Sequence, residues 1–143
     1  MTIDPKTVKA LRNARERLRD VAAANHTTAS GHRERAAAAV AAEHATLTAK
    51  LDAATMALAR ATSLADIHAI HDEIAAHRAA IIDAEHAHHR ATTDSDATAA
   101  QLRERTRELR TVERAIETDR RDRNDRAQRG EQRGHDDLSG RRR

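Results

Sequence analysis

The chain has 143 residues, with 26 basic and 23 acidic side chains and a formal net charge of only +3. It contains no Phe, Tyr, Trp or Cys, and Leu, Ile and Val together supply 20 residues against 33 Ala. This composition excludes a compact core of bulky side chains and a disulfide framework. Interleaved charges at low net charge favour long helices. We therefore expect one all-α domain over residues 1–143.

The first helix is expected over residues 5–61. Asp4 is a good N-cap, and Pro5 fits the first helical position, where its missing N–H is not needed. No other proline occurs in the chain. The helix carries an aliphatic stripe with a polar gap from Asn25 to His32. The stripe comprises Val8, Leu11, Leu18, Val21, Val40, Leu47, Leu51 and Leu58.

A turn is expected at residues 62–64, followed by a second helix over 64–129. Ser63 can cap that helix, with Asp66 three residues later as the acid of a capping box. The helix keeps one seven-residue register, which His88 and Ser95 interrupt with polar side chains. Its aliphatic members are Ile67, Ile74, Ile81, Leu102, Leu109 and Ile116.

The two stripes mirror each other about Thr62–Ser63. Leu58 and Ile67 are equally distant from that point, as are Leu51 and Ile74. The polar gaps match as well: Asn25, Thr28, Gly31 and His32 are expected to face Thr92, Ser95 and Thr98. Matching stripes and matching gaps predict a long two-helix antiparallel coiled-coil hairpin. Residues 130–143 are charged and contain three glycines, which predicts a flexible tail.

The sequence contains no clear motif for a catalytic site or a metal site. Glu85 and His88 have the spacing of a helical metal-binding motif, but such sites need two copies and further carboxylates. There is no Cys nucleophile, phosphate loop or nucleophile elbow. We expect no enzyme activity, no cofactor and no metal, with the histidines either in the seam, as His77 and His88, or solvated.

Nucleic acid and membrane partners are also disfavoured. The arginine-rich stretch of residues 103–126 is threaded with Glu and Asp, which repel phosphates, and no aromatic side chain can stack on a base. No apolar run approaches about 20 residues, and the N-terminus lacks an apolar signal core. We expect a cytoplasmic protein that does not insert into membranes, is monomeric and binds other proteins through its Arg-rich helix.

The end of the second helix resembles a known family. The segments Leu102–Leu109 and Val112–Ile116 lead into the arginine-rich run, which Glu131-Gln132 and Asp136-Asp137-Leu138 follow. Length, hairpin and these segments are similar to the FliJ/YscO (SctO) family, the central stalk proteins of flagellar and type III secretion export ATPases.

The resemblance implies a non-enzymatic stalk whose end with both termini inserts into a hexameric export ATPase. Such a stalk promotes ATPase activity, couples the ring to the cytoplasmic domain of the export gate and binds export chaperones, all at the cytoplasmic base of the secretion apparatus. A generic coiled-coil scaffold or adaptor is the alternative, with a nucleic-acid-binding helical protein behind it. The implied ATPase-facing residues are Arg103, Arg110, Arg114, Arg121, Glu131, Gln132, Asp136, Asp137 and Leu138.

Overall fold

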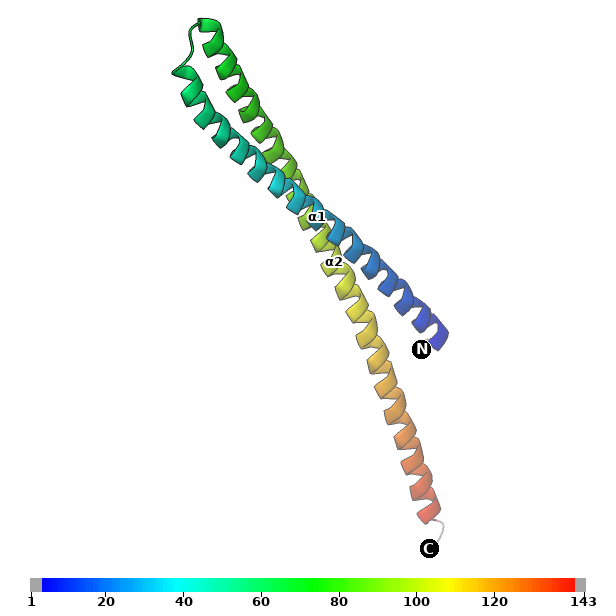
Figure 1. Cartoon of the computed structure of the whole chain (residues 1–143). Helices are drawn as coiled ribbons and strands as arrows, with labels where there is room; N and C mark the ends of the chain where they lie inside the picture. The colour runs from blue at the N-terminus through cyan, green and yellow to red at the C-terminus, as the bar shows by residue number, and fades with distance from the viewer. Residues whose placement is uncertain (1–3, 141–143) are drawn as a thin grey trace. The chain divides into compact units, whose positions relative to one another are not determined.

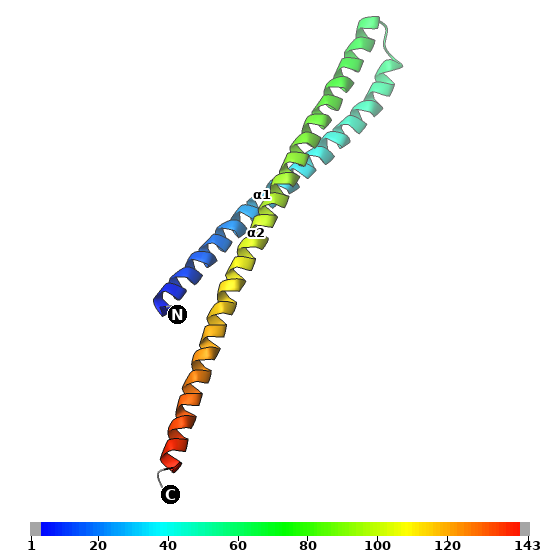
Figure 2. The same cartoon turned by 180° about the vertical axis from the view of Figure 1, so that it is seen from behind.

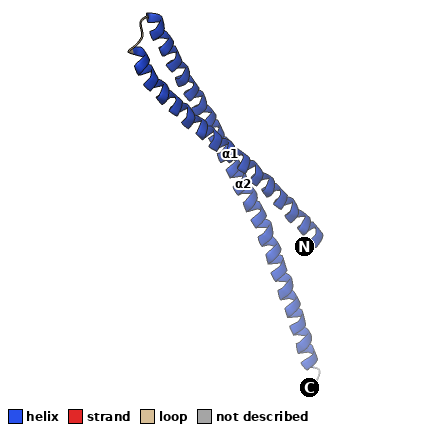
Figure 3. Ribbon diagram, viewed as in Figure 1, coloured by secondary structure: helices blue, strands red, loops and turns tan. Residues whose placement is uncertain are grey.

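The computed structural model describes the backbone of residues 4–140 and the side chains of residues 4 and 6–133. Over these residues the chain forms two helices, α1 (Pro5–Leu58) and α2 (Leu64–Gly140), and no strand (Figures 1 and 3). The predicted all-α fold is confirmed. Ala is the most frequent residue of both helices, and it has the highest intrinsic helix propensity.

The N-terminus of α1 is capped as the sequence predicts. The Lys6 backbone N–H donates to Asp4 Oδ1 at 3.1 Å, and the Val8 N–H donates to the Asp4 carbonyl oxygen at 3.1 Å. The side chain of Asp4 thus satisfies one of the N–H groups that the first helical turn leaves without a partner.

The connector between the helices is longer than predicted, because α1 ends at Leu58 and not at residue 61 (Figure 2). After Leu58 the backbone tightens: the Arg60 N–H donates to the Ala57 carbonyl at 3.0 Å, and the Ala61 N–H donates to the Leu58 carbonyl at 3.2 Å. These bonds span three residues, as in a 3₁₀ turn, and such turns commonly end an α-helix. The chain therefore begins to reverse before Thr62.

A capping box starts α2, as predicted. The Asp66 N–H donates to Ser63 Oγ at 3.2 Å, and the Ser63 N–H donates back to Asp66 Oδ2 at 3.0 Å. The Thr62 N–H donates to the same carboxylate oxygen at 3.3 Å. The hydrogen bond with Ser63, followed by the two backbone N–H groups, lowers the pKa of Asp66. The box fixes the direction in which α2 leaves the turn.

At its other end α2 runs to Gly140, beyond the boundary at residue 129 that the sequence predicted. A glycine inside a helix costs only about 1 kcal/mol, and the Glu131, Gln132 and Arg133 that follow Gly130 are good helix formers. Without a proline, Gly130 is too weak a signal to stop the helix. The flexibility expected of residues 130–143 stays a prediction, and residues 141–143 lie outside the described part of the chain.

The chain divides into two compact units, and both helices contribute to each. The terminal unit comprises Met1–Ala22 and Leu102–Arg143. The turn unit comprises Ala23–Gln101 and includes the connector. In each unit a segment of α1 packs against a segment of α2.

Contacts between the helices confirm the antiparallel register. In the turn unit, Ser30 Oγ lies 3.5 Å from Ser95 Oγ, and these two residues are equally distant from the predicted mirror point. Lys50 Nζ donates to Glu73 in the same unit, two residues off the mirror position. In the terminal unit, Arg15 Nη1 donates to Glu108 Oε2 at 2.6 Å, again two residues off. The positions that face each other were therefore predictable from the sequence to within two residues.

The predicted stripe of α2 is the inner face of that helix. Ile81, Ser95 and Leu109 are buried, and Leu109 is only 4% exposed. The other members of the seven-residue register are half-buried: Ile67, Ile74, His88, Leu102 and Ile116. One strict heptad register thus faces α1 in both units, as expected for a coiled-coil seam.

The predicted stripe of α1 is wrong for most of its large residues. Leu11, Leu18 and Val21 are exposed in the terminal unit, and Leu51 and Leu58 are exposed in the turn unit. Only Val8, Val40 and Leu47 are half-buried as expected. The buried positions of α1 are instead small residues, Ala22 and Ala54.

The cause is a difference of period. Leu11 and Ala22 are eleven residues apart and share one face of a straight helix. The less exposed positions Val8, Arg15, Ala22 and Ala29 follow one another in seven-residue steps, and Leu11 and Leu18 lie outside that line. Alanines occupy several of the contact positions, among them Ala22, Ala29 and Ala54, where small side chains allow the two backbones to approach closely.

The polar gap exists, but α1 contributes different residues from those predicted. His26 Nδ1 lies 3.3 Å from Thr98 Oγ1, and Ser30 meets Ser95, which is 2% exposed. Asn25, Thr28 and His32 were expected in the seam, but they are exposed. These three border a hollow of about 360 Å³ in the turn unit, together with Ala29, Ala87, Arg90, Ala91 and Asp94.

Candidate functional site

The described residues hold no group of three or more His, Cys, Asp or Glu side chains arranged to bind a metal ion. The closest histidine–carboxylate contact is between His44 Nε2 and Glu85 Oε1 at 3.6 Å, and both side chains are about half exposed. Within residues 4–140, no helix is both long and apolar enough to cross a membrane.

Four of the predicted partner-facing arginines form a single line on α2. Arg103, Arg110, Arg114 and Arg121 are spaced by seven, four and seven residues. At 100° per residue these positions fall within about 40° around the helix, and the line extends about 27 Å along its axis. All four side chains are exposed, and all belong to the terminal unit. We call these four residues the arginine line.

Most of the arginine line lacks a carboxylate partner within the described residues. Arg121 Nε pairs with Glu117 Oε1 at 3.0 Å, whereas Arg103, Arg110 and Arg114 form no ion pair there. Other arginines of α2 are paired: Arg107 lies 3.5 Å from Glu104, and Arg123 lies 2.6 Å from Asp119. Among the described residues, Glu104 and Asp119 therefore pair with arginines outside the line, and three guanidinium groups of the line have no ion pair.

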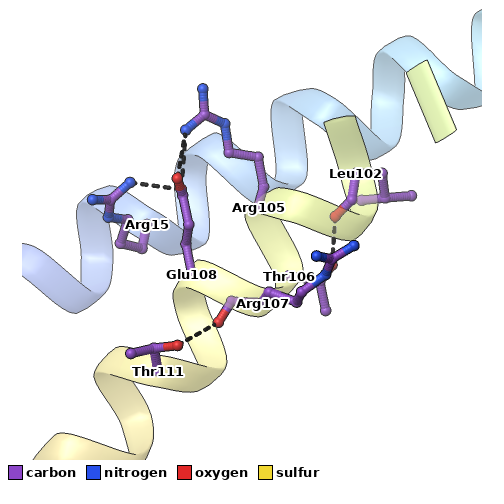
Figure 4. A network of polar contacts seen from close by, with 7 residues as sticks. All are labelled: Arg15, Leu102, Arg105, Thr106, Arg107, Glu108 and Thr111. Atoms are coloured by element: carbon purple, nitrogen blue, oxygen red, sulfur yellow. Dashed lines mark hydrogen bonds and ion pairs between the residues drawn. The ribbon is translucent and has the colours of Figure 1, made fainter. Parts of the chain in front are cut away.

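A cross-helix network joins α1 to α2 at the level of the arginine line, on another side of α2 (Figure 4). Glu108 accepts from Arg15 Nη1 of α1 at 2.6 Å and from Arg105 Nη1 of α2 at 3.0 Å. The Arg105 hydrogen bond contributes most to lowering the pKa of Glu108, and Arg15 adds to it. Nearby, Thr106 Oγ1 donates to the Leu102 carbonyl at 2.8 Å, and Thr111 Oγ1 donates to the Arg107 carbonyl at 3.0 Å.

Beyond Ile116, α2 has no described contact with α1. The register places the start of α1 opposite about residue 120. Every side chain from Glu117 to Arg133 is exposed, and this stretch contains no Leu, Ile or Val. A helix that is polar on all sides gains little from burial and depends on pairs such as Arg121–Glu117. This segment is the part of the terminal unit most open to a partner.

Of the other predicted site residues, only Gln132 is shown to share the face of the arginine line. Gln132 is exposed and continues the arginine line on the same face of α2. Glu131 is exposed but lies about 80° away from Arg103 around the helix. Asp136, Asp137 and Leu138 belong to the helical backbone of α2, but they lie outside the residues whose side chains are described.

The exposed aliphatic side chains of α1 were not predicted as a surface, because their spacing on a straight helix placed them in the seam. The signal was present in the sequence. The aliphatic residues of α1 occupy several heptad positions, whereas most of those of α2 keep one register, with Leu64, Ile70, Ile82 and Val112 outside it. Leu11, Leu18 and Val21 therefore form a second surface in the terminal unit, separate from the arginine line on α2.

No protein-family model matches this sequence, and neither a curated protein nor a solved structure matches the chain. The resemblance to export stalk proteins therefore rests on the residues themselves and on the hairpin that they form.

Proposed function

We propose that this chain is a non-enzymatic central stalk for the ATPase of a type III secretion or flagellar export apparatus. Its terminal unit inserts into the pore of the hexameric ring and promotes ATP hydrolysis. The turn unit couples the ring to the cytoplasmic domain of the export gate, and export chaperones bind to the helices. The protein acts at the cytoplasmic base of the apparatus.

The observation that carries this proposal is the arginine line. Arg103, Arg110 and Arg114 are exposed, have no carboxylate partner among the described residues and point in one direction from a continuous helix. Guanidinium groups make bidentate bonds with carboxylates and are weakly hydrated, which suits a protein interface. A ring interior with fixed acidic groups is a complementary surface for such a line.

Two features of the hairpin fit a coupling role. The heptad seam on α2 keeps one register in both units, and Ile81 and Leu109 anchor it. Helices packed in this way transmit displacement better than a flexible linker does. The exposed stretch Glu117–Arg133 has no apolar face of its own, so it can adapt its many charged side chains to a partner.

The alternative function is a generic coiled-coil adaptor, which would use the same line of arginines on another acidic protein. Nucleic acid fits less well, because Glu104, Glu117 and Asp119 lie among the arginines of α2 and repel phosphates.

Binding to the purified export ATPase of the same secretion cluster tests the proposal. The test variant combines Arg110→Glu, Arg114→Glu and Arg121→Glu. The control combines Arg35→Glu, Arg78→Glu and Arg90→Glu, three exposed arginines of the turn unit with the same change in net charge. We expect the test variant to bind about tenfold or more weakly and the control to bind as the original chain does.

Equal losses in the two variants would reduce the effect to net charge and would contradict a specific role for the arginine line. Absence of binding by the original chain would reject the stalk and leave the adaptor. A duplex DNA probe, titrated in parallel, would identify a nucleic-acid-binding protein if only DNA bound.

A further inference from the structure

The terminal unit exposes an aliphatic stripe on α1. Leu11, Leu18 and Val21 are 47%, 43% and 59% exposed, and Ala14 lies between them. Their spacing of three, four and three residues puts all four on one face of the helix. We call these residues the Leu11 stripe. Such spacing is what a helix needs in order to pack against another helix.

The segment that bears the Leu11 stripe is strongly basic. Between Pro5 and Ala22 it carries six cations and two carboxylates. Both carboxylates are already paired within the segment: Glu16 with Arg12 at 3.0 Å, and Asp20 with Arg19 at 2.6 Å. Of the other cations, Arg15 pairs with Glu108 of α2. Lys6, Lys9 and Arg17 have no ion-pair partner among the described residues.

The turn unit exposes a second stripe, with the opposite charge around it. Leu51 and Leu58 are exposed on α1, and Leu64 at the start of α2 is 68% exposed. We call these three residues the Leu58 stripe. Between Lys50 and Glu73 the chain carries four carboxylates and two cations. Lys50 pairs with Glu73, so the balance of the remaining charges is negative.

We propose that the Leu11 stripe of one copy of this chain packs against the Leu58 stripe of a second copy. Leu11 and Leu18 are seven residues apart, and so are Leu51 and Leu58, so the two pairs of leucines have equal spacing along their helices. Side chains with equal spacing can interdigitate along a helix pair. The charges around the Leu11 stripe are mainly basic, and those around the Leu58 stripe are mainly acidic. Electrostatic attraction therefore favours contact between the two different stripes over contact between two identical ones.

The same observations disfavour a membrane as the occupant of the Leu11 stripe. Its apolar side chains are two leucines, a valine and an alanine, without an aromatic residue. Helices that lie in a membrane surface bury a large apolar face rich in Trp, Phe and Leu, and this short stripe offers only two leucines. The contact is head-to-tail, because it joins different surfaces of two identical chains, and it makes the protein oligomeric at high concentration. The inference does not rest on the proposed stalk function.

Sedimentation velocity of the isolated full chain tests the inference. Interference optics are needed, because the chain has no Trp or Tyr. Over about a hundredfold range of concentration at low salt, we expect the mean mass to rise above that of the monomer. The rise should be reduced at high salt, since screening weakens the contact between the two charged segments.

Two double variants identify the surfaces. The first combines Leu11→Gln and Leu18→Gln; the second combines Leu51→Gln and Leu58→Gln. Each removes one stripe and keeps the other, and Gln preserves helix propensity. We expect each variant alone to be monomeric. An equimolar mixture should form a dimer, because it contains one intact stripe of each kind.

Met56→Gln is the matched control. Met56 is exposed near the same end of α1, but it lies two residues before Leu58 and faces a different direction. It should associate as the original chain does, and circular dichroism should show the same helicity in all variants. A monomer at every concentration would overturn the inference. So would a mixture of the two variants that stays monomeric, or association that survives in either variant alone.

Discussion

At the level of single residues, burial separates the aliphatic side chains that hold the hairpin together from those that do not. Leu109 is almost fully buried against α1 in the terminal unit, whereas Leu11 in the same unit is about half exposed. Both are leucines in long helices, so their helix propensities are the same. Their contributions to stability should differ through burial alone.

We predict that Leu109→Ala destabilises the chain by about 2–4 kcal/mol, since it removes buried methyl groups and leaves a cavity between the helices. Leu11→Ala should cost less than about 1.5 kcal/mol, because water already reaches much of the Leu11 side chain. Urea unfolding followed by far-UV circular dichroism measures both values. Equal losses in the two variants would show that Leu11 is buried in the folded chain.

At the level of the helices, two carboxylates link elements to each other. Asp66 caps α2, and Glu108 bridges Arg105 of α2 to Arg15 of α1. Ser63 and Arg105, respectively, contribute most to lowering their pKa values. A carboxylate with a lowered folded-state pKa stabilises the fold above the unfolded-state pKa of about 4, and that stabilisation is lost as the pH falls through the folded-state value.

We therefore predict that the melting temperature falls as the pH drops below about 4, and that Asp66→Asn and Glu108→Gln reduce this fall. The variants should melt below the original chain at neutral pH and approach it in acid. Glu34→Gln is the control, because Glu34 is exposed and makes no described ion pair. Thermal unfolding from pH 7 to pH 3 supplies the data. If the melting temperature of a variant differed from that of the original chain by the same amount at every pH, the stabilising role of the ionised Asp66 or Glu108 carboxylate would be contradicted.

The helices also show what the sequence could and could not predict. The seam of α2 was predictable because Ile67, Ile81 and Leu109 keep one strict heptad register. The seam of α1 was not, because many of its contact positions hold small or polar side chains, such as Ala22, Ser30 and Ala54, which carry little hydrophobic signal. Its leucines share a face only on a straight helix. The capping box was predictable from Ser63 and Asp66, since caps depend on local sequence.

The candidate site was predictable only in part, because the sequence determines residue spacing but not which side chains pair. The arginine line follows from residue spacing on a helix, and the sequence gives that spacing. Which arginines lack a partner depends on rotamers and on contacts with α1, as the three-way contact of Glu108 with Arg15 and Arg105 shows. The spread of the α1 leucines over several heptad positions indicates that some of them lie outside the seam, but which ones are exposed depends on the contact face of α1.

At the level of the whole molecule, the proposed function and the proposed self-association involve the same terminal unit. The arginine line lies on α2, and the Leu11 stripe lies on α1 of that unit. Binding in a narrow ring pore excludes a second copy from the terminal unit, so the two states would compete by mass action. Oligomers of the chain would then dissociate as monomers bind to the ATPase ring.

The most direct test of the stalk is steady-state phosphate release by the export ATPase from the same secretion cluster. The assay adds this protein in excess, either as the original chain, as the Arg110/Arg114/Arg121→Glu variant or as the Arg35/Arg78/Arg90→Glu control. The account predicts that the original chain and the control raise the rate severalfold and that the arginine-line variant does not. An unchanged rate with the original chain, at concentrations where it binds the ring, would contradict the stalk function.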